Sequence, residues 1–329
     1  MKKVIIINLS IIFLIIMATE TTLRIFLDIT PQGISKGIID ENSSEPRFNY
    51  KKINKGKVFG QKVYTDEDGF RISKDHNNRV NQNNRNIYFV GGSVTFGSGV
   101  KQSETFSGLL NRQLGEFNIY NASVTGSNLK NNIDIIKKKI DKKNLEMIYI
   151  NFSLDDIQNN NNLVKEIEKK KTTTNSFMNL IKKNYFIKKI NIFIRSKSVT
   201  YVWVKGVIFN SEKNYYLHAL NTFKNKSNLI SLKILMKEIN KYNKELNDKI
   251  KFLIIPYSYQ ITDSNCQKED YAERIIEKSL KENNLKYFKI KNFFCGNNQK
   301  NKIFFNQDPS HLSKYGHNEV AKYLKSKIK

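Results

Sequence analysis

Two short stretches that lie far apart in the chain carry the residue types of serine-dependent acyl transfer. Ser93 follows Gly91 and Gly92 at the end of an apolar run, and Asp308 and His311 stand in the tetrapeptide Asp-Pro-Ser-His near the C-terminus. Acyl transfer needs a nucleophile, a base that takes its proton and a carboxylate that orients the base. Because a lone Ser or Asp on a loop is more often a turn or cap residue, the two stretches carry this chemistry only if the fold brings them together.

The residues around Ser93 predict a strand that ends in a nucleophile turn. Residues 86–99 read NIYFVGGSVTFGSG, in which the apolar run 87–90 has the length and composition of a buried strand. A helical pattern begins near residue 103. Two glycines after a strand leave the next side chain exposed at the carboxyl edge of the sheet, where α/β proteins bind their ligands.

From residue 86 onward, strand-like and helix-like patterns alternate. The strands are predicted at residues 87–90, 117–120, 147–152, 251–256 and 287–290. The helices are predicted at residues 104–114, 129–140, 229–247, 271–281 and 313–328. This alternation indicates an α/β fold, a parallel sheet with helices on both faces in the flavodoxin-like manner.

Residues 158–227 interrupt the alternation and are predicted to be a helical insertion. They include an Asn run and a Lys-rich amphipathic segment at residues 177–194. The insertion could be a lid over the site, a basic amphipathic surface that lies on a membrane, or a helical excursion that packs on the core. The last of these is the default interpretation.

The N-terminus predicts export and a membrane anchor. Lys2 and Lys3 precede an apolar run at residues 4–18, a pattern that places the rest of the chain outside the cytoplasm. Residues 1–29 are interpreted as an uncleaved single-pass anchor, with a cleaved signal peptide as the alternative. Residues 30–85, which are polar and rich in turn signals, are interpreted as a linker packed on the catalytic domain, residues 86–329.

Composition excludes some classes of site and leaves one covalent question open. The net charge is +26, but the excess of Lys is scattered along the chain, so no specific nucleic-acid site is predicted. The spacing of the Cys and His residues predicts no metal site. Cys266 and Cys295 could form a disulfide, which export would permit, or remain free thiols.

Two further loops follow predicted strands, at residues 121–126 and 153–156. Gly126 ends the first loop, where a glycine lets a backbone N–H approach a reacting oxygen. Two other motifs do not fit the nucleophile turn. An α/β-hydrolase elbow would need Gly where Thr95 stands, and a P-loop would need Gly-Lys-Ser/Thr where the chain has Gly97-Ser98-Gly99.

Taken together and in this order, the four loops resemble the blocks of the SGNH (GDSL-type) hydrolase family, in its membrane-anchored bacterial envelope branch. Gly91–Gly97 is similar to the nucleophile block of the branch that reads GGS-x-T-x-G, and residues 308–311 match the D-x-x-H block. The resemblance implies a three-layer α/β/α fold and serine ester hydrolysis or acyl transfer without a cofactor. Ser93 would be the nucleophile, His311 the base and Asp308 its partner.

The resemblance also implies an oxyanion hole, and here the sequence departs from the family. The N–H groups of Ser93 and Gly126 would be two donors, and an Asn amide in a G-x-N-D block would be a third. Asp155 stands at the Asn position, and an ionised carboxylate cannot donate. Either Asp155 is held protonated, Asn128 or Asn151 replaces it, or the activity is weak.

The leading hypothesis is a serine esterase or O-acyltransferase for acyl esters, O-acetyl esters above all, of a cell-envelope polysaccharide. It would be held in the cytoplasmic membrane with its catalytic domain on the outer, periplasmic or extracytoplasmic side. Its partners would be the acylated glycan and the membrane. The alternatives are a catalytically impaired glycan-binding or envelope-assembly protein, and a lipase or lysophospholipase.

Overall fold

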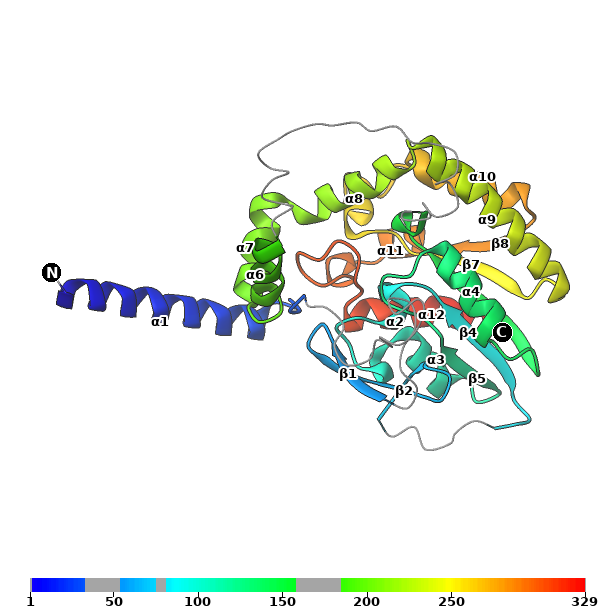
Figure 1. The fold of residues 1–329 in the computed structure, drawn as a ribbon, viewed down its shortest axis with the longest axis horizontal. Helices are drawn as coiled ribbons and strands as arrows, with labels where there is room; N and C mark the ends of the chain where they lie inside the picture. The colour runs from blue at the N-terminus through cyan, green and yellow to red at the C-terminus, as the bar shows by residue number, and fades with distance from the viewer. Residues whose placement is uncertain (1, 33–53, 75–80, 158–184, 329) are drawn as a thin grey trace.

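The computed structural model describes residues 2–32, 54–74, 81–157 and 185–328. The first helix, α1 (Lys2–Phe26), projects away from the rest of the molecule (Figure 1). Its segment Lys3–Phe26 is long and apolar enough to cross a membrane, by length and composition, and its apolar window is not buried against other parts of the protein.

The predicted parallel sheet is present and forms the centre of the molecule. Its parallel strands are β4 (Arg85–Val90), β5 (Phe117–Asn121), β6 (Leu145–Phe152), β7 (Ile250–Ile254) and β8 (Lys286–Lys289). They lie in the order β5-β4-β6-β7-β8. The change of direction around β4 places the carboxyl ends of β4, β5 and β6 next to one another, which is where an open α/β sheet binds its ligand.

Three antiparallel strands extend this sheet at the β5 edge. They are β1 (Asn54–Val58), β2 (Gln61–Thr65) and β3 (Arg71–Ile72), and β3 joins β5 through the pair Arg71 and Asn121. The sequence analysis predicted only a packed linker at residues 30–85. The described part of that segment does pack on the domain, and it also adds strands, because Val58, Val63 and Phe70 are buried in the core. Residues 33–53 and 75–80 of the predicted linker lie outside the described residues.

Helices cover both faces of the sheet and produce three layers (Figure 1). One face carries α4 (Leu129–Lys139), α9 (Lys226–Glu245) and α10 (Tyr271–Glu282), which share an apolar cluster with one side of the strands. The other face carries α3 (Phe106–Gln113), α11 (Lys291–Cys295) and α12 (Lys314–Ile328). The three-layer α/β/α arrangement is therefore as predicted.

The insertion contributes three described helices, α6 (Tyr185–Arg195), α7 (Val199–Phe209) and α8 (Ser211–Thr222). Helix α7 packs against α1, and α8 packs against two short 3₁₀ helices at the sheet edge, η2 (Leu154–Ile157) and η4 (Ser258–Ile261). The predicted Asn run and residues 177–184 of the predicted amphipathic segment lie outside the described residues. The division of the chain at residues 29, 85 and 157 stays a prediction.

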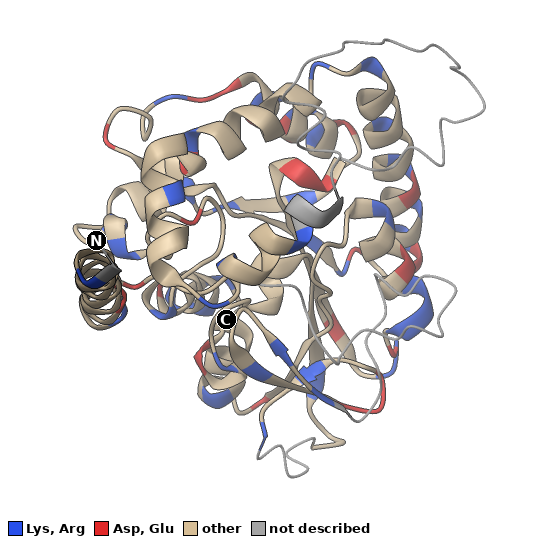
Figure 2. Cartoon of the chain, turned by 60° about the vertical axis from the view of Figure 1, so that its left-hand side comes forward, with Lys and Arg blue, Asp and Glu red and all other residues tan. Residues whose placement is uncertain are grey.

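Cys266 and Cys295 form a disulfide, so the first of the two alternatives left open by the sequence holds. The bond joins the segment after η4 to the last residue of α11. In the view of Figure 2, Lys and Arg positions are distributed over many helices and strands.

Candidate active site

The structure brings Ser93, His311 and Asp308 into one hydrogen-bonded chain. The Oγ of Ser93 lies 2.8 Å from Nε2 of His311, and Nδ1 of His311 lies 2.9 Å from both carboxylate oxygens of Asp308. Ser93 is the first residue of the short helix α2 (Ser93–Phe96), directly after β4. Because Nδ1 faces a carboxylate, it carries the proton, and Nε2 is free to accept the proton of the Ser93 hydroxyl.

The nucleophile turn needs glycine at position 91. A Cβ atom on Gly91 would lie 2.5 Å from Oγ1 of Thr95 and 3.1 Å from Cβ of Asn151. The chain therefore passes from β4 into α2 so closely to its neighbours that no side chain fits. This close approach explains the first of the two glycines before Ser93, whereas a Cβ atom on Gly92 would make only an ordinary contact, 3.6 Å from the carbonyl oxygen of Ser127.

A buried arginine holds the far end of the same turn. The guanidinium of Arg71 donates hydrogen bonds to the carbonyl oxygens of Phe96, of Gly97 at 2.7 Å and of Val100. It also lies over the Phe96 ring, 4.6 Å from its centroid. Carbonyls after a helix end need donors, and a charged donor that is buried with them forms strong hydrogen bonds. Arg71 thus stabilises the short helix that presents Ser93.

The loop before α12 holds Asp308 in an almost closed environment. Its side chain is 2% exposed, and its Oδ1 accepts the backbone N–H groups of Ser310 at 3.0 Å and His311 at 2.8 Å. Burial by itself would raise the pKa of Asp308, but the charge of His311 and these hydrogen bonds outweigh it and lower the pKa below its usual value. Asp308 is therefore ionised when it faces the imidazole.

Two residues that the sequence does not indicate support Asp308, one by direct contact and one through the first. Nε2 of Gln32 donates to Oδ2 of Asp308 at 3.2 Å, and Oε1 of Gln32 accepts a hydrogen bond from Arg195. Gln32 follows α1 and Arg195 ends α6, so neither has a local sequence pattern that would indicate this role. They tie the acid to the N-terminal segment and to the insertion.

An aromatic ring covers the imidazole of His311. The Phe59 ring meets the His311 ring edge to face, with 4.7 Å between the centroids. Phe59 and Gly60 form the turn between β1 and β2. The antiparallel extension of the sheet thus supplies one wall of the site, and it limits the orientations that His311 can adopt.

Gly126, the predicted second oxyanion donor, lies in a loop that is attached to the nucleophile turn. The loop that carries it is fastened to the carbonyl of Gly91 by the N–H of Val124 at 3.0 Å and the hydroxyl of Ser127 at 2.9 Å. The φ angle of Gly126 is +78°, a conformation that favours glycine. Within the part of the chain that the structure describes, the N–H groups of Ser93 and Gly126 donate to no protein acceptor.

Asp155 serves as a hydrogen-bond acceptor. Its two carboxylate oxygens accept the hydroxyl of Tyr257 at 2.7 Å and that of Tyr215 at 2.9 Å. Burial, then the negative charge of Asp155, raises the pKa of the Tyr215 hydroxyl, which therefore keeps its proton. Tyr215 lies on α8, so the insertion contacts the position where the family has its Asn. The two tyrosines are partners that sequence reasoning missed.

The structure shows how the groups that could compensate for Asp155 in the oxyanion hole are placed. The side chain of Asn128 caps α4 by accepting the N–H of Asn131 at 3.0 Å. Asn151 is buried beside Gly91, and its Oδ1 has no partner among the described residues. Neighbouring Asp156 is fully buried, and burial followed by the charge of Asp155 raises its pKa well above its usual value. Of the two Asn candidates, Asn151 is thus the one that lies beside the nucleophile turn.

Comparisons with known proteins give structural similarities only. No protein family model and no curated protein matches the sequence. An acetyl xylan esterase, AlAXEase, is 12% identical with a TM-score of 0.44, over 74% of this chain and 100% of that one. A lipase/acylhydrolase from Enterococcus faecalis is 13% identical with a TM-score of 0.40, over 74% and 97%. A member of the lipolytic G-D-S-L family from Veillonella parvula is 11% identical with a TM-score of 0.40, over 74% and 97%. Because these TM-scores lie below 0.5, the function is inferred below from the site itself.

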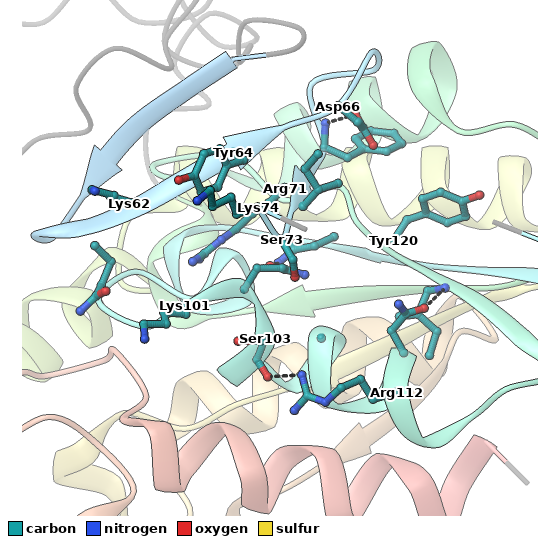
Figure 3. A pocket seen from close by; sticks show the side chains of 18 of the residues that line it. Lys62, Tyr64, Asp66, Arg71, Ser73, Lys74, Lys101, Ser103, Arg112 and Tyr120 are labelled. Atoms are coloured by element: carbon teal, nitrogen blue, oxygen red, sulfur yellow. Dashed lines mark hydrogen bonds between the residues drawn. The ribbon is translucent and has the colours of Figure 1, made fainter. Parts of the chain in front are cut away.

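A separate groove lies on the other side of the β1–β2 turn from His311. It has a volume of about 710 Å³ and lies between the antiparallel strands, the 3₁₀ helix η1 (Gln102–Glu104) and α3. Figure 3 shows four of its cations, which line it together with Tyr64 and Tyr120: Lys62, Lys74, Lys101 and Arg112. None of these four forms a salt bridge with another described residue.

The groove and the catalytic site share a wall. Gly60 lines the groove, whereas the preceding residue, Phe59, contacts His311. Asn121 also lines the groove, and its amide donates to the carbonyl of Thr95 in α2 at 3.2 Å. Among the described residues, no group of three or more His, Cys, Asp or Glu side chains could hold a metal ion.

Proposed function

We propose that this chain is an SGNH-type serine esterase or O-acyltransferase that acts on acyl esters, O-acetyl esters above all, of a cell-envelope polysaccharide. The observation that carries the proposal is the continuous hydrogen-bonded chain from the Ser93 hydroxyl through His311 to the buried Asp308. A hydroxyl, an imidazole and an ionised carboxylate in this order are what nucleophilic acyl transfer requires.

The geometry supports a two-step reaction. Oγ of Ser93 attacks the ester carbonyl while Nε2 of His311 takes its proton, and the N–H groups of Ser93 and Gly126 stabilise the oxyanion. The imidazolium then gives this proton to the leaving sugar oxygen, and the acyl group stays on Ser93. Water resolves the acyl-enzyme in an esterase, and a sugar hydroxyl resolves it in a transferase. In both cases His311 takes a proton from the incoming hydroxyl and returns it to Ser93.

Features outside the catalytic residues support the proposed location and substrate class. The apolar α1, which begins with two lysines, supports a single-pass anchor with the catalytic domain outside the cytoplasmic membrane. The disulfide is compatible with that side. A polymer needs a surface beyond the bond that reacts. The cationic groove behind the β1–β2 turn provides one, and its charge favours a glycan that carries carboxylate or phosphate groups.

The second candidate is a catalytically impaired envelope-assembly or glycan-binding protein. Asp155 favours it, because a carboxylate engaged by two tyrosines stands where the family has an oxyanion donor. Loss of one such donor costs about 10²–10³ in rate. A lipase is a third candidate, and it would prefer long acyl chains over acetyl groups.

The decisive experiment compares the full-length protein in detergent with its Ser93→Ala variant. Wild type should hydrolyse p-nitrophenyl acetate and react with a fluorophosphonate probe, whereas Ser93→Ala should do neither. The matched control, Ser264→Ala, changes an exposed serine of a loop and should behave as wild type. Fluorophosphonate labelling that survives in Ser93→Ala would remove Ser93 from the mechanism.

A second measurement separates the candidates and the substrate classes. The wild-type protein should release acetate from an acetylated acidic polysaccharide or transfer the acetyl group to an added sugar acceptor. The double variant Lys62→Gln with Lys101→Gln should have a raised KM for this polymer only. Hydrolysis of p-nitrophenyl acetate by the same double variant should be unchanged. Binding of the polymer without any ester cleavage would support the second candidate.

A further inference from the structure

Two helices of the insertion expose apolar side chains to solvent. On α7, Val207, Ile208 and Phe209 are 52%, 68% and 60% exposed, and on α6 Phe193 is 66% exposed. Val204, Val207 and Ile208 lie at positions i, i+3 and i+4, so they form one stripe along α7. We name the exposed apolar residues of the two helices the α6–α7 face. Contiguous apolar surface of this kind indicates an interaction site.

The anchor helix is fixed to the beginning of α7. The carboxylate of Glu20 accepts the N–H groups of Val199 at 3.0 Å and Thr200 at 2.9 Å and the hydroxyl of Ser198 at 2.9 Å. A carboxylate at these first N–H groups is a favourable helix cap. Arg24 adds a hydrogen bond to the carbonyl that precedes this cap. The position of α7 therefore follows from the position of α1.

Apolar packing reinforces this joint. Leu23 of α1 lies in one buried cluster with Val199 and Val202 of α7, and Trp203 packs against it. Helices α6 and α7 run across the end of α1 rather than along it (Figure 1). If α1 stands upright in a bilayer, the two helices lie parallel to the bilayer plane.

The length of the apolar run in α1 sets the depth of α6 and α7 relative to the bilayer. Residues 4–19 of α1 carry no charge, and at 1.5 Å per residue they rise about 24 Å. The hydrocarbon core of a bilayer is about 30 Å thick. The run ends at Glu20, so the joint with α7 lies at the membrane boundary rather than above it. The hydrogen bonds that the Glu20 carboxylate accepts from α7 compensate its negative charge at the membrane boundary.

We propose that the α6–α7 face is embedded in the interfacial layer of the bilayer that α1 crosses, and that its occupant is lipid. Interfacial helices bury their apolar side about 5–10 Å into the boundary between headgroups and acyl chains. The face is thus a second membrane contact in addition to the anchor. It fixes the orientation of the catalytic domain, which a single flexible span would leave free.

This contact reaches the candidate active site. Gly206 of α7 packs so closely on Gln307, the neighbour of Asp308, that a Cβ atom there would lie 2.5 Å from Cβ of Gln307. At the end of α6, Arg195 holds Gln32, which donates to Asp308. The site therefore lies on the bilayer surface, and esters held close to the membrane reach it. The membrane contact itself does not depend on the proposed reaction.

The test uses single-tryptophan variants of the full chain in phosphatidylcholine vesicles. Trp203 is the only tryptophan of the sequence, so Trp203→Phe provides a dark background. In it, Phe209→Trp reports on the α6–α7 face, and Ile208→Trp is a second reporter if the first variant does not fold. Ile234→Trp on α9, which is 48% exposed, is the matched control away from the face.

Vesicles that contain lipids brominated near the headgroup should quench the two reporters on the face. We expect Phe209→Trp to lose about half or more of its fluorescence, as burial within brominated lipid requires, and Ile234→Trp to lose almost none. Emission of Phe209→Trp that is blue-shifted but unquenched would show a second protein copy or another part of this chain on the face, and it would overturn the proposal. Solvent-like emission, or failure of the full chain to enter vesicles, would also overturn it.

Discussion

Replacement of Asp308 by Asn tests whether the carboxylate works through the tautomer of His311. Oδ1 of Asp308 already accepts the N–H groups of Ser310 and His311, so the Asn oxygen is expected to keep that place. The new NH₂ group then occupies the position of Oδ2, 2.9 Å from Nδ1 of His311. Oδ1 lies equally 2.9 Å from Nδ1, but it is already engaged by two backbone N–H groups. The new NH₂ group therefore competes as a donor against Nδ1–H and drives the imidazole to carry its proton on Nε2. In that form it cannot take the proton of Ser93.

The expected loss is large because orientation and charge are lost together. A neutral amide at the acid position of such a triad lowers kcat by about 10⁴-fold, which corresponds to about 5 kcal/mol of transition-state stabilisation. Gln32→Ala removes a hydrogen bond to the same carboxylate but leaves its charge and the tautomer intact. A hydrogen bond to a charged group is worth about 1.5–3 kcal/mol, so the loss for Gln32→Ala should stay near ten- to a hundredfold.

The assay is the steady-state hydrolysis of p-nitrophenyl acetate, together with thermal unfolding as the control for folding. Asn is nearly isosteric, so the Asp308→Asn variant should fold and lose kcat with little change in KM. A variant that unfolds near the wild-type temperature and keeps more than about a tenth of kcat would refute the role of Asp308, since orientation alone contributes more than this. Equal losses in Asp308→Asn and Gln32→Ala would refute the tautomer argument.

Three further predictions concern parts of the same fold. Asp155→Asn should raise kcat for the same ester, by up to about 10²–10³-fold, because it restores an amide at the position where the SGNH family has an oxyanion donor; a fall in kcat at unchanged thermal stability would contradict this. Cys266→Ser with Cys295→Ser should lower the free energy of unfolding in urea by about 3–4 kcal/mol, and a reductant should then have no further effect. His317 is fully buried, and burial, followed by the charges of neighbouring cations, lowers its pKa from 6.5 to about 3. Its unfolded form binds a proton below pH 6.5 and its folded form does not, so stability should fall by about 1.4 kcal/mol per pH unit as the pH drops from 6.5 toward 3. His317→Gln should flatten this slope in urea unfolding at pH 6.5 and pH 5, and an unchanged slope would show that other groups produce it.

The parallel sheet could be predicted because its strands are continuous apolar runs bounded by turns. The predicted strand 87–90 lies within β4, and the predicted helix 313–328 corresponds to α12. Strands buried on both faces and helices with one apolar stripe are the patterns that periodicity detects best. The order of the strands in the sheet was not predicted, because right-handed connections restrict the possible orders without choosing one of them.

The antiparallel strands could not be predicted in the same way. β3 has two residues, and β1 reads NKGKV, which has neither alternation nor a β-branched run. These strands exist because Val58 and Phe70 reach the core and Arg71 pairs with Asn121, which are tertiary contacts. Such context overrides local propensity in edge strands.

In the candidate site, the sequence indicated groups with their own local motif and missed groups that only the fold brings near. Ser93 and the Asp308–His311 pair each stand in a recognisable turn. Tyr215 and Tyr257, which hold Asp155, come from two segments with no motif. A residue that acts through a long-range hydrogen bond leaves no pattern of spacing, so a single sequence cannot indicate it.

The segment that follows α1 joins the proposed anchor to the candidate active site. Residues 28–32 follow α1 directly, and the carbonyl of Asp28 accepts the N–H of Asn306 at 2.8 Å, two residues before the catalytic acid. The hydroxyl of Thr30 donates to the carbonyl of Phe59 at 3.2 Å, and Gln32 donates to Asp308. Removal of the chain up to residue 32 would therefore unpair the catalytic loop and the wall over His311 as well as the anchor. These contacts favour an uncleaved anchor over a signal peptide cut beyond α1, because the site uses the residues that follow the helix.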